Sequence, residues 1–302
     1  MSGIYDKNGN FLSSAYDKNG NSLSLAYDKN GNVIWSAVPA HLRVANYNVG
    51  DWYIGAHNYV PETKKEQYEN LQRTIFQNMN ADVCCMQEAP PKFCQDGTLA
   101  STFLDDFFPY IEVCTSSTSS SIPYRTNASK YPIENFQMIQ FPTGGTGTTV
   151  TYEKFYITVE GRRICIVESH LSLTKSYAIT EAHELIDAVD GEQYYIIMGD
   201  FNTGLHSDED YTQDEDYLTI VKPFLDAGMN SANVSTFGAF ETYGSVSYEA
   251  FLRGEGYMSA TDHIFTSPNI TIADVWVERT KLTDSIADKI DHIPIVADLV
   301  IN

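Results

Sequence analysis

Polar side chains stand at the ends of six apolar, strand-like runs, and this ordered series constrains the fold more than any other feature. The residues are Asn48, Glu88, His170, Asp200 with Asn202, Asp262, and Asp291 with His292. A side chain at a strand end is exposed at one edge of a sheet, where several such groups can converge on one pocket. The series therefore predicts a β-rich domain with a polar site along one sheet edge.

Strand-like segments alternate with two helical segments after residue 36. The expected strands are 43–49, 82–86, 152–159, 164–169, 194–198, 262–266 and 293–301. A capping box at residues 63–66 begins one helix that runs to Met79, and apolar residues at helical spacing predict another over 179–189. This alternation favours two packed, mostly antiparallel β-sheets flanked by helices, as one domain over residues 37–302.

The first 36 residues carry a different pattern, the sequence YDKNGN repeated three times at a spacing of 11 residues. Asn-Gly favours a type I′ hairpin turn, because both central residues need positive φ. Residues 1–36 are therefore predicted to form a separate small β-meander. Cation binding by the Asp-x-Asn-x-Asn spacing is the alternative, although the glycine comes two positions earlier than in an EF-hand loop. The repeats resemble those of bacterial and phage surface or tail proteins, which implies attachment or oligomer contacts through this segment.

The chain is strongly acidic, with 40 acidic and 19 basic side chains and a formal charge of -21. The repeats contribute three of each, so the whole excess lies in residues 37–302. Such a surface repels polyphosphate at long range, which disfavours tight, non-specific nucleic-acid binding. A nuclease with only local contacts stays compatible with it, because a bound divalent cation offsets repulsion at the site. The acidic stretch 206–216 is expected to be a solvated loop rather than a calcium site.

Cysteine usage and apolar runs bear on the compartment. Adjacent Cys84 and Cys85 in an apolar run indicate reduced core thiols that point to opposite faces of a strand. No apolar run approaches the roughly 18 residues of a membrane span. The amino-terminal sequence also lacks the basic and apolar regions of a secretory signal. We therefore expect a cytoplasmic or phage-particle-associated protein without stable membrane insertion.

The polar series has a specific likeness. In order, the sequences VANYNVG, DVCCMQEA, IVESHLSL, IIMGDFNT, ATDHIF and KIDHIPIVADL resemble the motif set of the DNase I-like endonuclease/exonuclease/phosphatase superfamily. The resemblance extends from Asn48 to His292, and Gly-Asp-Phe-Asn after an apolar run is its most specific part. It implies a four-layer α/β sandwich and a metal-dependent phosphoesterase, that is, a hydrolase of phosphoric esters.

The resemblance implies a metal site and a set of catalytic groups. Asn48, Glu88 and Asp291 would hold Mg²⁺, with Mn²⁺ as an alternative, since hard cations prefer oxygen ligands. Some DNA-repair members carry a further carboxylate two residues after this asparagine. This chain has Gly50 there, which places more of the ligation on Glu88.

The remaining motif residues would act on the substrate. Asp200 would orient or deprotonate the attacking water, and Asn202 would donate its amide to developing negative charge. His170 and His292 would contact phosphate oxygens, with Asp262 orienting His292. The general base stays open between Asp200 and His292.

The substrate is less constrained than the chemistry. Arg125 and Lys130 are candidate contacts to a substrate phosphate, because such cations position a phosphate backbone without reading sequence. A catalytic region of about 265 residues with no evident large insertion favours a DNase I-like nuclease. A sphingomyelinase-like lipid phosphodiesterase and a nucleotide or inositol phosphatase are the alternatives, because the core alone does not name a substrate. An inactive binding or structural protein is a further alternative, which should lack several motif side chains.

The other histidines match no motif and are expected to be surface or packing residues. They are His41, His57, His183, His206 and His263. His263 directly follows Asp262 within a strand, so its side chain should face away from the site.

Overall fold

The computed structural model describes most of the chain after residue 38. The described residues are 15–16, 22–23, 25–27, 33–36, 39–50, 65–89, 103–114, 124–142, 151–205, 211–233, 242–244, 258–278 and 292–302. The predicted metal ligand Asp291 lies outside them, as do His57, His206 and Cys94.

One sheet is built around a parallel pair of strands. Its order is β16 (Ile270–Val277), β17 (Ile295–Ile301), β5 (Ala40–Asn48), β6 (Val83–Ala89), β8 (Tyr124–Ser129) and β7 (Tyr110–Cys114). Strands β5 and β6 are parallel, whereas the other neighbours are antiparallel. The connection between β5 and β6 contains α1 (Lys65–Met79), as a parallel crossover requires.

The second sheet repeats this arrangement. Its order is β13 (Asn230–Ser231), β15 (Met258–Thr266), β12 (Tyr195–Leu205), β11 (Arg162–His170), β10 (Thr151–Val159) and β9 (Glu134–Gln140), with β14 (Tyr243–Gly244) paired to β15. Strands β11 and β12 are parallel, and α2 (Lys175–Asp187) lies in their crossover. Each sheet thus has one parallel pair whose carboxyl ends share an edge.

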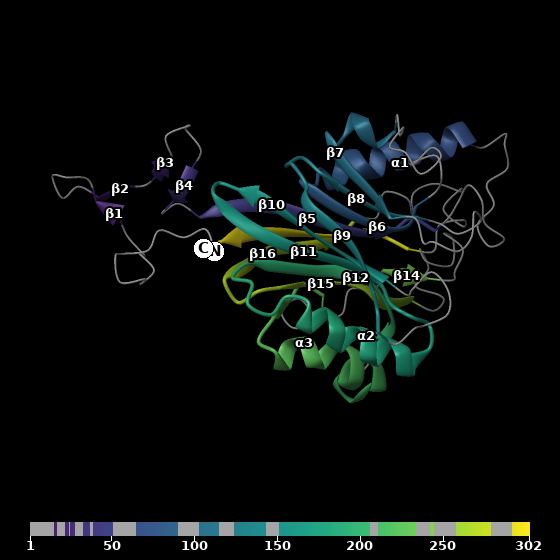
Figure 1. The fold of residues 1–302 in the computed structure, drawn as a ribbon. Coiled ribbons are helices and arrows are strands. Elements are labelled where there is room, and N and C mark those ends of the chain that lie inside the picture. The colour runs from purple at the N-terminus through teal and green to yellow at the C-terminus, as the bar shows by residue number, and fades with distance from the viewer. Residues whose placement is uncertain are drawn as a thin grey trace.

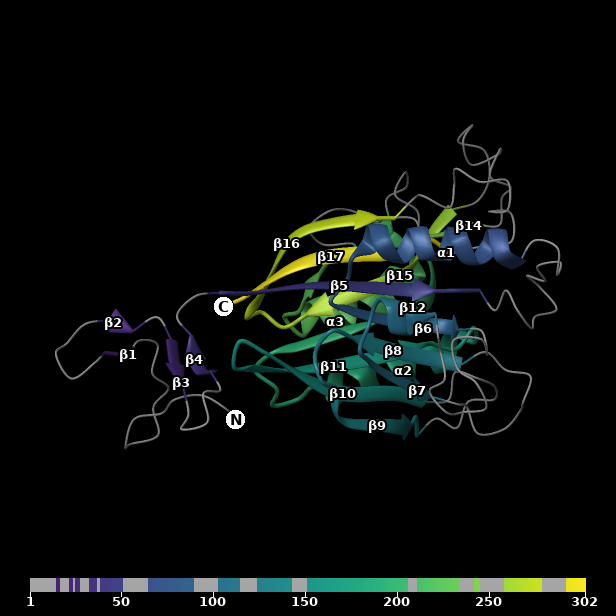
Figure 2. The same ribbon diagram turned by 90° about the horizontal axis from the view of Figure 1, so that it is seen from above.

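Three apolar cores divide the molecule into four layers. The largest lies between the sheets, α1 packs on the outer face of the first sheet, and α2 packs on the outer face of the second. A π-helical turn, η5 (Tyr217–Val221), and α3 (Lys222–Asp226) complete the layer that contains α2. Figures 1 and 2 show α1 on one side of the sheets and α2 and α3 on the other. The predicted four-layer α/β sandwich is confirmed.

The described parts of the repeat segment form two antiparallel strand pairs. Strand β1 (Ala15–Tyr16) pairs with β2 (Ser22–Leu23), and β3 (Leu25–Tyr27) pairs with β4 (Val33–Ser36). Each pair brackets one DKNGN sequence, whose own residues lie outside the described part. Among the described residues these pairs are two separate two-stranded sheets, and the β-meander over residues 1–36 stays a prediction.

The sequence pattern missed the helical region 217–226, the strands β7, β8 and β16, and the edge strand β9. Most side chains of β9 are exposed, so no apolar alternation marks it. The expected loop 206–216 is also more ordered than predicted at its described end. Tyr211–Gln213 forms a 3-10 turn (η4), and Asp216 accepts the backbone N–H of Gly204 at 2.8 Å.

Two single-feature expectations can be compared with the described residues. Cys84 packs in the core beneath α1 and Cys85 in the core between the sheets, as strand alternation predicted. Both are free thiols, as are Cys114 and Cys165. Within the described chain, no helix combines enough length with enough apolar residues for a membrane crossing.

Candidate active site

Apart from Arg125, Lys130 and Asp291, the predicted site residues meet where the parallel strands of both sheets end. Asn48 ends β5, Glu88 is the next-to-last residue of β6, and His170 ends β11. In the second sheet, Asp200 lies opposite His170 on one side and Asp262 on the other. The hydrogen bond from Asn48 Nδ2 to Asp200 Oδ2, at 2.9 Å, joins the two sheets at this edge.

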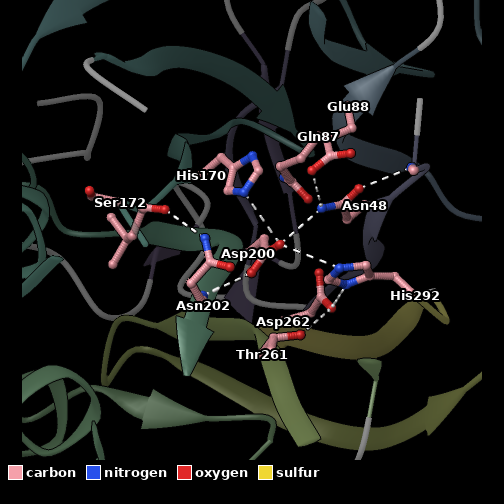
Figure 3. Close-up of polar contacts among 12 residues, drawn as sticks. Asn48, Gln87, Glu88, His170, Ser172, Asp200, Asn202, Thr261, Asp262 and His292 are labelled. Atoms are coloured by element: carbon pink, nitrogen blue, oxygen red, sulfur yellow. Dashed lines mark hydrogen bonds and ion pairs between the residues drawn. The ribbon is translucent and has the colours of Figure 1, made fainter. Parts of the chain in front are cut away.

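The carboxylate of Asp200 is the centre of the cluster (Figure 3). Besides Asn48, the Nε2 atoms of His170 and His292 lie 3.5 and 3.6 Å from its Oδ2, and the Asn202 backbone N–H donates to Oδ1 at 2.8 Å. Burial raises the pKa of Asp200 to about 6, although His292 and the donated hydrogen bonds favour the ionised form. A carboxylate with a pKa so near neutrality is suited to exchanging a proton.

His292 and Asp262 form a buried pair beside Asp200. His292 Nδ1 lies 2.8 Å from Asp262 Oδ2, and Thr261 Oγ1 donates to the same oxygen at 3.1 Å. Burial acts to raise the pKa of Asp262, but His292 and the hydroxyls of Thr242 and Thr261 outweigh it, so that pKa is lowered. The ionised Asp262 accepts a hydrogen bond from His292 Nδ1–H, and the other ring nitrogen, Nε2, then faces Asp200.

His170 faces Asp200 on the side opposite His292 in Figure 3. Burial lowers the pKa of His170, while the charge of Glu88 opposes this shift and that of Arg125 adds to it. The ring is therefore neutral around pH 7, with one nitrogen as a donor and one as an acceptor.

Irregular backbone aims two of the site residues. Glu88 has a φ of 50° and Asn202 a φ of 52°, in the left-handed region that residues other than glycine seldom adopt. Both lie where strand pairing shifts register, between residues 86 and 89 of β6 and between residues 200 and 205 of β12. Such bulges turn a side chain out of strict alternation. Asn202 Nδ2 donates to Leu171 O at 2.7 Å, which leaves its second N–H for a ligand.

Glu88 and Asn48 are a donor set that fits a hard cation. Glu88 is half-buried. Among the described residues, Asn48 Nδ2 donates a long hydrogen bond of 3.4 Å to Glu88 Oε1. Its carboxylate oxygens therefore retain lone pairs for a cation that prefers oxygen.

A second group of ligand atoms also lies close together. Those of Asp200, Asp262 and His292 are within 4.8 Å of one another and could hold a metal ion. His292 Nδ1 is engaged with Asp262 at 2.8 Å, so an ion there would have to use Nε2 and the Asp200 carboxylate.

The structure does not bring Arg125 to the cluster as a substrate contact. Its side chain is 5% exposed and lies between the sheets, 2.7 Å from Glu153 Oε1 and 3.8 Å from Glu168 Oε2. It also donates to the Thr151 carbonyl at 2.7 Å. The sequence marked a cation but not its burial, and the internal carboxylates explain why the guanidinium turns inward.

Lys130 is also away from the cluster. It follows β8, whose carboxyl end pairs with the start of β6, whereas Glu88 is near the end of β6. Its Nζ lies 3.2 Å from Asp82 and from Asn80 Oδ1. The antiparallel direction of β8 therefore carries Lys130 to the opposite end of the sheet, and its expected phosphate contact lacks structural support.

His263 turns away from the site, as predicted. Its Nε2 lies 2.8 Å from Thr203 Oγ1, and its ring stacks on Phe265 in the core beneath α2 and α3. Burial lowers the pKa of His263 to about 4, so the ring is a neutral packing residue. His41 and His183 are exposed.

The sequence did not single out the polar residues that support the cluster from behind. They are Asn46, Gln87, Glu168, Thr242 and Thr261. The available signal was the two-residue period of a strand: Asn46 and Glu168 each stand two positions before a predicted site residue and so share its face.

Comparisons with known proteins agree with this geometry. The family described as the endonuclease/exonuclease/phosphatase family matches residues 61–285. A comparison with curated proteins gave no match.

Similar folds occur among solved structures. An endonuclease/exonuclease/phosphatase from Beutenbergia cavernae has a TM-score of 0.60 and 16% identity, over 87% of this chain and 72% of that one. D. rerio TDP2 with a single-strand DNA product gives 0.62 and 14%, over 86% and 98%. The human Nocturnin catalytic domain with bound sulfate gives 0.59 and 16%, over 87% and 94%. Since the family match covers most of the chain, the chain belongs to the endonuclease/exonuclease/phosphatase family.

Proposed function

We propose that this chain is a divalent-metal-dependent phosphodiesterase that acts on nucleic acid, as a DNase I-like nuclease. The observation that carries the proposal is the convergence on Asp200 of an amide and two imidazoles, contributed by Asn48, His170 and His292. Cleaving a phosphodiester requires a proton acceptor for the attacking water and donors for the phosphate oxygens. This cluster supplies both within one buried edge.

The side chains divide the work as follows. Asp200 and His292, whose Oδ2 and Nε2 atoms are 3.6 Å apart, take up the proton of the attacking water, and Asp262 holds the imidazole that shares it. Asn202 donates its second amide N–H to a non-bridging oxygen, and the single N–H of the neutral His170 ring donates to another.

Glu88, Asn48 and Asp291 would hold the divalent ion, Mg²⁺ or Mn²⁺. When bound, such an ion neutralises charge on the phosphate and stabilises the leaving oxyanion. The oxygen-only donor set supports this choice over a softer metal.

Nucleic acid is the substrate class that we favour. D. rerio TDP2 holds a single-strand DNA product in a sandwich of the same fold, so this architecture accommodates a nucleic-acid strand. With a formal charge of -21, this chain should contact few phosphates and depend weakly on salt. A cyclic or small phosphoester is the second candidate, because ANGEL2, which shares the fold, is a 2′,3′-cyclic phosphatase and the acidic surface suits a substrate of low charge.

We further propose a division into a repeat segment, residues 1–36, and a catalytic domain, residues 37–302. The strand pairs of the repeats lie within the first part and all the described site residues within the second. The repeats would serve attachment or oligomer contacts, so removing residues 1–36 should leave turnover unchanged.

The test is turnover by the purified protein with Mg²⁺ on four substrates: supercoiled plasmid, single-stranded DNA, sphingomyelin vesicles and an inositol phosphate. DNA cleavage is the expected result. Turnover of only the lipid or the inositol phosphate, or of none of the four substrates, would refute the nuclease assignment.

Asp200→Asn provides the matched variant, and it should lower kcat by about 100-fold or more with the free energy of unfolding nearly unchanged. Lys130→Ala is the control, because Lys130 lies at the far end of β6 and should not affect turnover.

A further inference from the structure

A chain of hydrogen bonds runs from the buried side of the site into the space between the sheets. Asn46 Nδ2 donates to Asp262 Oδ1 at 2.9 Å, on the carboxylate oxygen opposite the one near His292. Gln87 Nε2 donates to Asn46 Oδ1 at 2.9 Å and to Glu168 Oε1 at 2.8 Å. All four of these linked side chains are fully buried. The chain joins two strands of one sheet through two strands of the other.

The Asp262 end of this chain sets the direction of both amides. The ionised Asp262 carboxylate accepts, so Asn46 must turn its NH₂ group to Asp262, and Gln87 must then turn its own NH₂ group to Asn46 Oδ1 and to Glu168 Oε1. The amides then bond to each other in both directions, since Asn46 Nδ2 also reaches Gln87 Oε1 at 3.3 Å. Flipping Asn46 would set its oxygen against Asp262 Oδ1, and flipping Gln87 would set its oxygen against Asn46 Oδ1. Only one arrangement satisfies all four groups.

Arg125 anchors the inner end of the chain. Its guanidinium lies between Glu168 and Glu153, and the side chains of both acids are 0% exposed. Burial raises the pKa of Glu153 to about 8 and that of Glu168 well above its usual range, and the charge of Arg125 opposes both shifts. The guanidinium therefore lies between two fully buried carboxyl groups, and Glu168 is held there by its contacts with Arg125 and Gln87.

We propose that Asn46 and Gln87 are positioning residues. Their hydrogen bonds to Glu168, to each other and to Asp262 fix the orientation of the Asp262 carboxylate. The inference rests on the proposed phosphodiesterase function, because it assigns these amides a part in that reaction. Among the described residues, Asn46 donates the hydrogen bond to Asp262 Oδ1. Removing the Asn46 amide would leave this buried oxygen without that hydrogen bond. Within the described part of the chain, the carboxylate is then held through Oδ2 alone, by Thr261 and His292, so its orientation is less constrained and so is the angle of the His292 ring to Asp200.

Two near-isosteric substitutions remove the donors. Asn46→Leu and Gln87→Met keep the side-chain volume but cannot donate, and each should lower kcat about 10- to 100-fold, because misplacing a catalytic group has such costs. KM should stay unchanged, because neither amide contacts the substrate. If Asn46→Leu fails to fold, Asn46→Ser keeps a small polar side chain and should lower kcat in the same direction.

Asn127→Ala is the matched control. Asn127 is also a fully buried amide on the inner face of the first sheet, opposite Cys85, and among the described residues neither of its side-chain polar atoms has a hydrogen-bond partner. It takes no part in the chain of hydrogen bonds, so its substitution should leave kcat unchanged.

An Asp262→Ala background separates positioning from general structural damage. If the amides act through Asp262, adding Asn46→Leu to Asp262→Ala should lower kcat by no more than about twofold. An equal loss in both backgrounds would mean that Asn46 acts on the fold and would overturn the proposal.

A readout without substrate keeps this inference distinct from the proposed function. The Nδ1-bound proton of His292, held by Asp262, should give a protected downfield imidazole resonance in the wild-type full-length protein. Asn46→Leu and Gln87→Met should shift or broaden this resonance, and Asn127→Ala should not. Failure to turn over any phosphoester would refute the function alone, whereas an unmoved resonance in both variants would refute the positioning chain.

Discussion

Replacing Gly199 with alanine should damage stability and turnover together. Gly199 precedes Asp200 in β12 and pairs with Ser169, which precedes His170 in β11. A Cβ atom on residue 199 would lie 1.9 Å from the Ser169 carbonyl oxygen and 2.9 Å from its carbonyl carbon. Both atoms are backbone, so no side-chain rotation relieves the overlap, and β11 and β12 must separate by about 1.5 Å to restore ordinary contact.

The size of each effect follows from that displacement. Overpacking against a rigid strand costs about 1–3 kcal/mol of unfolding free energy. A shift of about 1 Å between Asp200 and His170 should lower kcat about 100-fold, because reacting groups tolerate little misplacement. Urea unfolding and turnover on the preferred substrate measure the two effects.

Gly191→Ala is the control for this prediction. Gly191, in the turn before β12, has a φ of 77° and no neighbouring atom within 4 Å of an added Cβ. Its substitution should cost about 1 kcal/mol through backbone strain and leave kcat unchanged. Wild-type stability and kcat in Gly199→Ala would refute the reasoning from this close approach.

The remaining predictions concern the metal and two buried titratable groups. Chelation with EDTA should abolish turnover, Mg²⁺ or Mn²⁺ should restore it, and Glu88→Gln should raise the Mg²⁺ concentration required for half-maximal activity. The Glu153 pKa is raised from 4.5 to about 8, so its contribution to stability is complete below pH 4.5 and is lost as pH rises through 8. Glu153→Gln should therefore gain stability relative to wild type between pH 5 and 9, by a few kcal/mol in urea unfolding. The His263 pKa is lowered from 6.5 to about 4, so its contribution is complete above pH 6.5 and is lost as pH falls through 4. Between pH 6.5 and pH 4, the free energy of unfolding of His263→Gln should therefore fall by about 3 kcal/mol less than that of the wild type. An identical pH dependence of the two proteins would contradict this prediction.

The local sequence pattern was sufficient to predict the helices and strands that are buried on one or both faces. Strands β10, β11 and β12 and helix α2 are buried on one or both faces, so their periodicity or continuous apolar runs are visible in the sequence. Edge strand β9 and the helical region 217–226 lacked that signal.

The sequence by itself determined which chemical groups flank the strands, because Asn48, Glu88, His170 and Asp200 each follow an apolar run and His292 precedes one. Two parallel strand pairs bring such ends to one edge, and this likewise follows from the order of strands and crossovers.

Only the tertiary structure decided what each polar group faces. Arg125 turns inward because two carboxylates from the other sheet lie across from it, and Lys130 is remote because β8 runs antiparallel to β6. The link from Glu168 through Gln87 to Asp262 likewise crosses between the sheets. Such contacts depend on how the two sheets stack. Stacking is a property of the assembled core, and a local stretch of sequence does not predict it.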